Sequence, residues 1–169
     1  PLALDAYVTD KSKHLFESNE IYNHAELEAR HEIMLEAYIK KVQIEARVMG
    51  DLATTFILPS AVKYQNVLIK NILGLKEAGL AETAYANQKQ VLEAISNHIN
   101  IVSDHVEKMI EARKKANELT DTREMAIAYC DQVKGKYFDV IRYNVDKLEL
   151  LVDDAFWLLP KYREILFLR

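Results

Sequence analysis

Few residues in this chain can interrupt a helix or cross-link the fold. The 169 residues include only 4 glycines, 3 prolines and a single cysteine, Cys130. One cysteine excludes an internal disulfide framework and is typical of a reducing compartment, so we expect a cytoplasmic protein. No apolar run approaches the roughly 20 residues that a membrane-spanning helix needs, and no secretory leader opens the chain. The sequence therefore predicts no membrane partner.

Basic residues are also fewer than acidic ones, 22 against 26. The formal net charge is -4, and a mildly acidic balance argues against a surface built for nucleic acid. The short basic run at 113–115 is flanked by glutamates and has no interleaved aromatic residues. We interpret it as a solvated helix face and predict no nucleic-acid partner.

Alternating strand patterns are absent, and apolar residues instead follow helical spacing. Three segments repeat them at intervals of four and three residues, namely Leu35, Ile39, Val42, Ala46, Met49, Ala53 and Phe56; Leu92, Ile95, Ile99, Val102, Val106 and Met109; and Cys130, Val133, Tyr137, Val140, Asn144, Leu148 and Leu151. This spacing is typical of long helices packed nearly parallel to one another. We therefore predict an all-α fold.

The scarce breaking residues and the capping residues mark the helix ends. They predict an antiparallel bundle of three long helices with short N- and C-terminal helices, at about 9–18, 25–73, 81–118, 121–156 and from Pro160 onward. Asn23 or His24 is the expected cap of the second helix, and Thr120 or Asp121 that of the fourth. Pro59 removes one backbone donor and clashes with the carbonyl of Thr55, which predicts a kink near Pro59. The sequence leaves open whether the helix bends there or breaks.

The second helix is predicted to be longer than its neighbours. At 1.5 Å per residue, its excess length should project at its N-terminal end, around residues 24–36. That projection would bare Leu27, Ile33, Met34 and Leu35. An exposed apolar cluster of this kind marks a contact surface, so these four are candidate interaction residues.

The C-terminal end carries a second set of candidates. Asp153 and Asp154 fall in the last predicted turn of the fourth helix, where carboxylates oppose the helix dipole. They are either a solvated helix end or a contact with a basic surface elsewhere. Trp157 and Phe167 belong to an apolar stretch beyond them. That stretch either plugs the end of the bundle or docks on another surface.

Chemistry-bearing motifs are incomplete. Glu28 and His31 match half of a di-iron helix pair, but no other histidine has the partner carboxylate at this spacing. His98 and His105 with Cys130 do not complete a plausible zinc shell. No glycine-rich phosphate loop occurs. We predict no catalytic, cofactor-binding or metal-binding residue in this chain.

Four segments, in order and spacing, resemble the C-terminal region of type III glutamine synthetases, the large bacterial form. They are Tyr38-Ile39-Lys40-Lys41 with Ile44-Glu45-Ala46-Arg47; Ile57-Leu58-Pro59 with Lys63-Tyr64-Gln65-Asn66; Ile110 to Asn117; and Asp146 to Asp154 with Trp157 and Leu159 to Glu164. The resemblance implies a parent enzyme that joins ammonia to glutamate using ATP and a divalent metal, Mg or Mn. It also implies that the metal and nucleotide sites lie upstream, so it assigns no catalytic residue here.

The resemblance implies a domain organisation and partners. Residues 1–23, which open without an initiator Met, would be an exit segment from an upstream catalytic domain, and 24–169 the helical bundle domain. The partners would be the rest of the parent synthetase chain and neighbouring subunits of a homo-oligomer. The alternatives are a free-standing helical adaptor that binds partner helices and, more remotely, a metal-dependent bundle enzyme.

Overall fold

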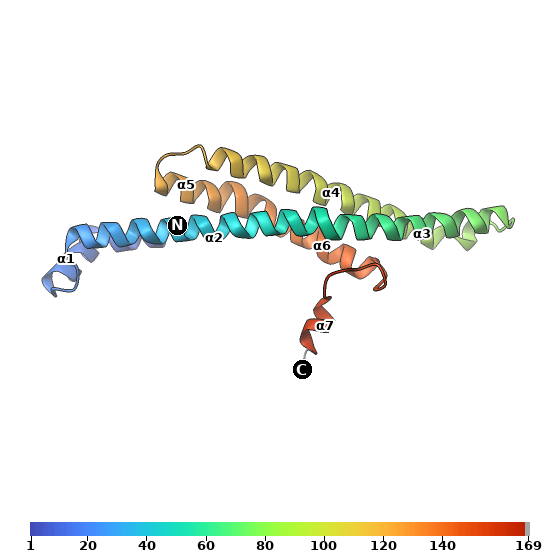
Figure 1. Ribbon diagram of the computed structural model, residues 1–169, viewed down its shortest axis with the longest axis horizontal. Helices are drawn as coiled ribbons and strands as arrows, with labels where there is room; N and C mark the ends of the chain where they lie inside the picture. The colour runs from blue at the N-terminus through green and yellow to red at the C-terminus, as the bar shows by residue number, and fades with distance from the viewer. Residues whose placement is uncertain (168–169) are drawn as a thin grey trace. The chain divides into compact units, whose positions relative to one another are not determined.

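The computed structural model describes residues 1–167, and the regular structure of this range is entirely helical (Figure 1). In chain order the elements are η1 (Leu4–Val8), α1 (Asp10–Ser18), α2 (His24–Leu52), η2 (Ala53–Ile57), α3 (Leu58–Glu77), η3 (Glu82–Ala84), α4 (Ala86–Ala116), α5 (Thr122–Ala128), η4 (Tyr129–Phe138), α6 (Asp139–Leu151) and α7 (Tyr162–Leu166). No strand occurs within residues 1–167, so the all-α prediction is confirmed. Leu168 and Arg169 of the predicted bundle domain lie outside the described residues.

The prediction of three long helices is only partly right. The predicted second helix is made of α2, η2 and α3 in direct succession, and the predicted fourth helix is made of α5, η4 and α6. The long α-helices are α2, with 29 residues, and α4, with 31. The π-helical segment η2 interrupts the predicted second helix, and the π-helical segment η4 interrupts the predicted fourth helix. Spacing of apolar residues detects a helix but does not report these local changes in winding.

Side-chain caps begin two of the helices as their sequences predict. The Asn23 side chain accepts a hydrogen bond from the Glu26 amide at 2.9 Å, and the Glu26 carboxylate accepts one from the Asn23 amide at 2.9 Å. Asp121 accepts one from the Glu124 amide at 2.8 Å. These contacts satisfy amide groups that have no partner inside the helix.

Pro59 widens its helix and does not break it. The backbone stays in the right-handed helical region at Leu52, Ile57 and Leu58. The π-helical segment η2 occupies the five residues 53–57 just before the proline. A π turn bonds each amide one residue further back, so the chain accommodates the missing proline donor by changing its winding.

The second π-helical segment, η4, moves the buried face by one residue. Sequence spacing predicts Tyr137 and Val140 in the core, but both are only half-buried. Phe138 and Ile141 are buried instead, with exposed fractions of 8% and 1%. A π turn holds more residues than an α turn, so the buried positions closest to it shift by one, while Asn144 and Leu148 further along are buried as the spacing predicts. Those two core assignments were therefore wrong, and the winding is the reason.

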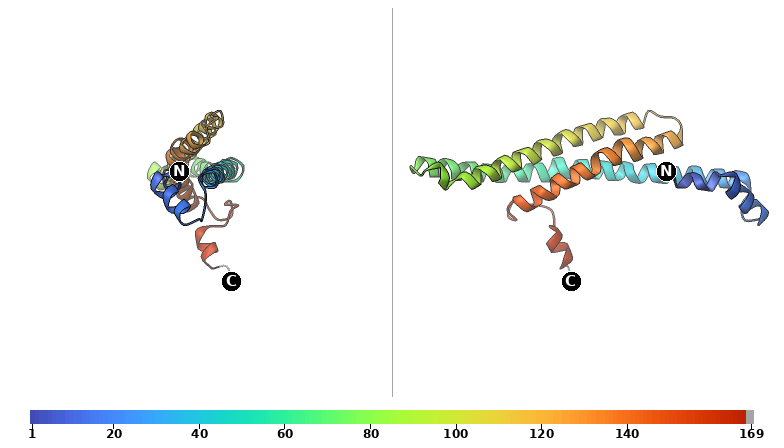
Figure 2. Two further views of the ribbon diagram at one scale, coloured as in Figure 1. Left: turned by 90° about the vertical axis from the view of Figure 1, so that its left-hand side faces the viewer. Right: turned by 180° about the vertical axis from the view of Figure 1, so that it is seen from behind.

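The chain forms two compact units. The first unit contains residues 1–48 and 109–138, and the second contains residues 49–108 with those from 139 onward. In each unit a segment of α4 runs in the direction opposite to the segments from α2–α3 and from α5–α6 (Figure 2). Residues 1–23 belong to the same compact unit as residues 24–48. The domain boundary at residue 23 therefore stays a prediction.

Buried residues join the three segments within each unit. The first unit buries Leu35 and Val42 of α2 and Tyr129 of η4, and the second buries Ile95 of α4 and Leu148 of α6, all at 2% exposure or less. In the second unit the buried Asn144 side chain lies 2.8 Å from Nδ1 of His98 and donates to the Val140 carbonyl at 2.8 Å. Core packing of this kind supplies most of the stability of such helices.

The turn after α3 contains a glycine with a left-handed backbone. Gly79 has φ +79°, and the Leu80 amide donates to the Leu75 carbonyl at 3.1 Å, as in a Schellman motif. Gly79→Ala should lower the free energy of unfolding by about 1 kcal/mol, because a side chain opposes this conformation. Gly74→Ala, in the last part of α3 with open space around it, should raise it by about 0.5–1 kcal/mol. Urea unfolding measures both, and equal effects of one sign would contradict this assignment.

Candidate interaction sites

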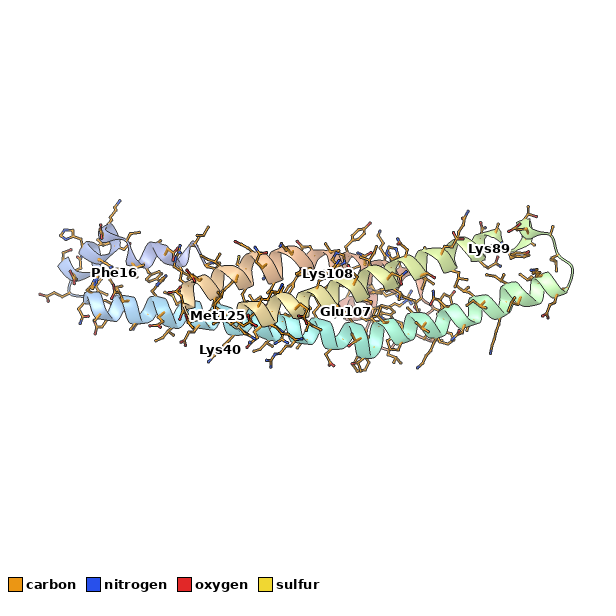
Figure 3. The ribbon with its side chains drawn as sticks, turned by 90° about the horizontal axis from the view of Figure 1, so that it is seen from above. Phe16, Lys40, Lys89, Glu107, Lys108 and Met125 are labelled. Carbon is orange, nitrogen blue, oxygen red and sulfur yellow. The ribbon has the colours of Figure 1, made fainter. Side chains whose placement is uncertain are left out.

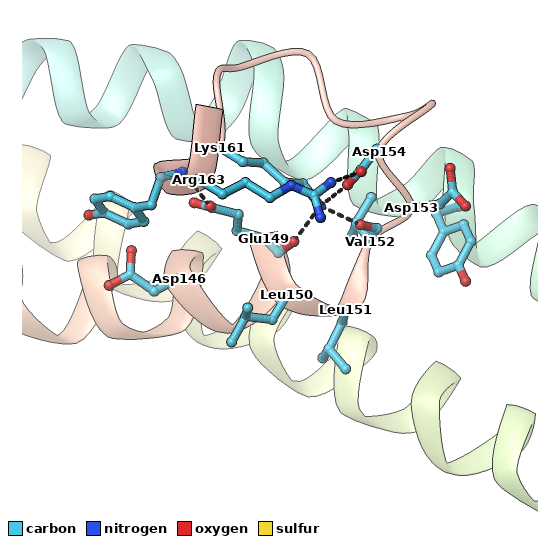
Figure 4. Close-up of a pocket in the computed structure, with 11 residues that line it drawn as sticks. Asp146, Glu149, Leu150, Leu151, Val152, Asp153, Asp154, Lys161 and Arg163 are labelled. Atoms are coloured by element: carbon cyan, nitrogen blue, oxygen red, sulfur yellow. Dashed lines mark hydrogen bonds and ion pairs between the residues drawn. The ribbon is translucent and has the colours of Figure 1, made fainter. Parts of the chain in front are cut away.

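A buried lysine organises the C-terminal end of the second unit. Lys161 is only 8% exposed. Its Nζ donates to the carbonyls of Glu149 at 2.7 Å and Val152 at 3.0 Å, and it forms an ion pair with Oδ1 of Asp154 at 2.6 Å (Figure 4). The three acceptors match the three protons of an ammonium group. Two of them are carbonyls at the end of α6, so Lys161 caps this helix end and favours its dipole.

Aromatic packing completes the same site. Nζ of Lys161 lies 5.8 Å from the centroid of Trp157, whose side chain is buried beneath it. The Phe156 ring packs on Tyr64 of α3 with centroids 5.9 Å apart. We call Lys161, its acceptors at 149, 152 and 154, and Trp157 the Lys161 latch. It joins the chain after α6 to the end of that helix.

An open groove of about 660 Å³ lies beside the Lys161 latch. It is lined mainly by charged side chains and by the end of α6, including Asp146, Glu149, Asp153, Asp154, Lys161 and Arg163. Most of these charges already have partners: Arg163 pairs with Asp154, and the Glu149 carboxylate accepts from the Tyr162 amide at 2.9 Å. The walls of the groove therefore keep an excess of acidic side chains, with four carboxylates against two cations.

The structure separates the predicted C-terminal candidates into two kinds. Asp153 accepts from the Ala155 amide at 2.8 Å, and Asp154 pairs with Lys161 and Arg163. The basic groups that Asp154 contacts thus belong to its own unit. Trp157 is 9% exposed and Phe167 is 81% exposed. Trp157 is buried beside Lys161, whereas Phe167 is exposed and available for contact.

The four predicted interaction residues near the N-terminus also differ in their exposure. Ile33 is 63% exposed and Met34 is half-buried. Leu27 and Leu35 are buried, at 0% and 2% exposure. The expectation that α2 projects bare at all four positions is therefore wrong for Leu27 and Leu35. The reason is that residues 1–22 fold back along the first turns of α2, where Figure 3 shows Phe16 of α1.

An ion-pair cluster fastens this N-terminal segment. Asp5 accepts from Nε of Arg123 at 3.1 Å and from Nη2 of Arg123 at 2.7 Å. Nε2 of His31 lies 3.2 Å from the same carboxylate. Glu28 instead contacts Lys13 at 3.3 Å and His24 at 3.0 Å. The two members of the predicted Glu28–His31 pair thus serve different contacts within the first unit.

Known proteins with similar sequences indicate the family of this chain. The family model described as "Glutamine synthetase C-terminal domain" matches residues 1–76. A glutamine synthetase of Bacteroides fragilis (strain YCH46) is 42% identical over 171 residues, which cover 99% of this chain and 23% of that protein. Residues 1–76 of this chain belong to the glutamine synthetase C-terminal domain family.

Two further relatives are matched over a similar share of their length. A type-3 glutamine synthetase of Dictyostelium discoideum is 28% identical, over 100% of this chain and 23% of that protein. A glutamine synthetase of Butyrivibrio fibrisolvens is 28% identical, over 99% of this chain and 24% of that protein. The chain thus spans about a quarter of the length of the curated relatives it matches.

The remaining sequence candidates of this glutamine synthetase domain have local partners. His98 contacts Asn144, and Nδ1 of His105 lies 2.9 Å from the Ile101 carbonyl. Cys130 is half-buried beside Tyr38, and burial together with this thiol raises the pKa of Tyr38. Across residues 1–167 no three His, Cys, Asp or Glu side chains are grouped as metal ligands would be. The same range contains no helix long and apolar enough to cross a bilayer.

Sequence reasoning missed the residues that organise both ends of this glutamine synthetase domain. Lys161 was read only as part of the family resemblance, and Asp5 and Arg123 were not singled out. Asp5 and Arg123 are 118 positions apart in the sequence, so no local pattern links them. Pro160 restricts the backbone of Leu159 and not that of Lys161, so no local pattern marks Lys161 either.

The Asp5 cluster should make stability depend on pH. Hydrogen bonding to Arg123, and secondarily the contact with His31, lowers the pKa of Asp5. A depressed folded-state pKa contributes stability at pH values above the unfolded pKa of about 3.9, and this is lost as pH falls through the folded pKa. Asp5→Asn should therefore cost about 1 kcal/mol at pH 7, and the difference should vanish in acid. Urea unfolding from pH 7 to pH 2 measures this, with exposed Glu36→Gln as the control. A constant difference down to pH 2 would contradict it.

Proposed function

We propose that this chain is the C-terminal helical structural and assembly domain of a type III glutamine synthetase and is not catalytic by itself. The observation that carries the proposal is the similarity of nearly the whole chain to glutamine synthetases of which it covers about a quarter. The parent enzyme would ligate ammonia to glutamate with ATP and Mg or Mn in the cytoplasm. Its active site would lie in the remaining three quarters of the chain.

Exposed apolar side chains support an assembly role. Ile33 and Ile44 of α2 are 63% and 61% exposed, and Phe167 beyond α7 is 81% exposed. Apolar surface of this extent favours contacts with other protein surfaces. The partners would be the rest of the parent synthetase chain and neighbouring subunits of a homo-oligomer, a symmetric assembly being the commonest outcome for such enzymes.

Removing this domain from the parent enzyme tests the proposal. The truncated parent should form smaller species in light scattering coupled to gel filtration. The isolated 169-residue chain should form no glutamine when supplied with glutamate, ammonia and Mg-ATP. A truncated parent that keeps both its mass and its activity would contradict the assembly role, and turnover by the isolated chain would contradict the non-catalytic assignment. A free-standing adaptor would show no parent reading frame upstream.

A further inference from the structure

The chain beyond the Lys161 latch displays apolar side chains to solvent. Leu158 is 61% exposed, Ile165 53%, Leu166 78% and Phe167 81%. Between them, Arg163 pairs with Asp154, and the Glu164 carboxylate accepts from the Lys161 amide at 3.2 Å as part of the cap of α7. The segment therefore carries an exposed apolar patch, here called the apolar face, and Arg163 within the same segment pairs with the second unit.

The base of α7 is held in place despite its short length. Lys161 makes its three contacts immediately before the helix, and the Tyr162 amide donates to Glu149 at 2.9 Å. Arg142 of α6 donates to the Tyr162 hydroxyl at 2.7 Å. A five-residue helix has little stability of its own, so these contacts determine its position. They present the apolar side chains with reduced conformational freedom, which lowers the entropic cost of binding.

We propose that this apolar face, formed by Leu158, Ile165, Leu166 and Phe167, docks into an apolar surface of the catalytic portion of the parent synthetase. Lys161 is the positioning residue of the contact. This inference rests on the proposed function and names the partner of one of its surfaces. Trp157 and Asp154, by contrast, act inside the second unit and hold Lys161.

The area of the face favours a tethered partner over a separate, untethered protein. From the exposed fractions, the four side chains offer on the order of 500 Å². A stable interface between separate proteins buries about 800 Å² on each partner. A contact within one chain or one assembly needs less, because a covalent link already supplies a high effective concentration. The relatives carry about three quarters of their length outside the matched region, which provides such a tethered surface.

Photo-cross-linking in the full-length parent enzyme identifies the partner directly. Phe167 is replaced by p-benzoylphenylalanine, and cross-linked peptides are identified by mass spectrometry. The expected product joins position 167 to a peptide of the catalytic portion. The matched control places the same group at Leu150, which is 79% exposed and points away from Lys161 and Arg163 in Figure 4. Cross-links confined to this domain, its own or a second copy, would overturn the proposal, and so would none at all.

The cross-linking yield of a Lys161 variant tests the positioning role of Lys161. Lys161→Met should reduce the cross-linking yield from position 167 at least fivefold, while Lys70→Met on exposed α3 leaves it unchanged. A yield unaffected by Lys161→Met would remove Lys161 from the proposal. Loss of assembly on truncation without the cross-link defeats the docking inference alone. The cross-link without any effect of truncation defeats the assembly function alone.

Discussion

Replacing Lys161 with Met should detach the C-terminal segment from α6 and shift the fluorescence of Trp157 to longer wavelength. Trp157 is the only tryptophan of the chain, so its emission reports this site alone. The substitution keeps most of the apolar stem and removes the ammonium group. The carbonyls of Glu149 and Val152 and the carboxylate of Asp154 then lose a charged donor. Hydrogen bonds to charged groups contribute about 1.5–3 kcal/mol each at such sites, so we expect a loss of about 3 kcal/mol in local stability.

Two measurements separate local release from global unfolding. Circular dichroism of Lys161→Met should change little, because α7 contains only five helical residues. Limited proteolysis should cut between residues 152 and 161 faster than in the unmodified chain. Lys70→Met, on exposed α3, is the control and should leave the emission unchanged. An unshifted emission spectrum for Lys161→Met would show that Trp157 packing holds the segment without the lysine.

Leu27→Ala should destabilise the first unit by about 2–5 kcal/mol, whereas Ile33→Ala should cost less than about 0.5 kcal/mol. Leu27 has no exposed surface and lies under the N-terminal segment, so truncating it leaves a cavity. Ile33, six positions later on α2, is 63% exposed and loses few contacts. Chemical denaturation of the isolated chain measures both. Similar losses for the two variants would show that residues 1–22 do not cover α2 in solution.

In the parent enzyme, a charged substitution at Ile33 should affect assembly more than folding. Because its side chain is exposed in the domain, Ile33→Asp should weaken assembly of the parent while the isolated domain melts within a few degrees of the unmodified domain. Glu32→Asp at the neighbouring exposed position is the control. Leu27→Asp, by contrast, should prevent folding of the first unit, so it reports nothing about assembly. An intact oligomer with Ile33→Asp would assign this side chain to ordinary solvent-exposed surface.

Local sequence information was sufficient for the helices and most of their buried faces. Ile95, Val102, Val106 and Met109 of α4 follow the predicted spacing and are all at most 1% exposed. The caps at Asn23 and Asp121 were readable because a cap depends only on residues within one turn. The positions at 137 and 140 were misassigned, because the same residues fit an α turn or a π turn until their tertiary contacts are known, whereas Asn144 and Leu148 further along were assigned correctly.

The contacts that hold the two terminal segments in place join residues that are far apart in the sequence. Nothing near Leu27 indicates that residues 1–22 return along α2, so helix length alone predicted an exposed projection. The predicted start of the last helix at Pro160 was early, since α7 begins at Tyr162. Lys161 is extended there, with ψ 156°, and this conformation lets its side chain reach α6. Charged groups paired across such distances carry no periodic pattern.

The winding of η4 also has an evolutionary meaning. Its buried residues Val133 and Phe138 are five positions apart, one more than the spacing of an α-helical face. The segment can therefore be understood as a helix that has absorbed a single-residue insertion without losing its core. A methyl group at Gly135 would lie 3.2 Å from the Cys130 carbonyl, so this turn favours a residue without a side chain. Homologues that lack one residue between 129 and 138 should keep the phenylalanine and isoleucine of this face in an uninterrupted α-helix.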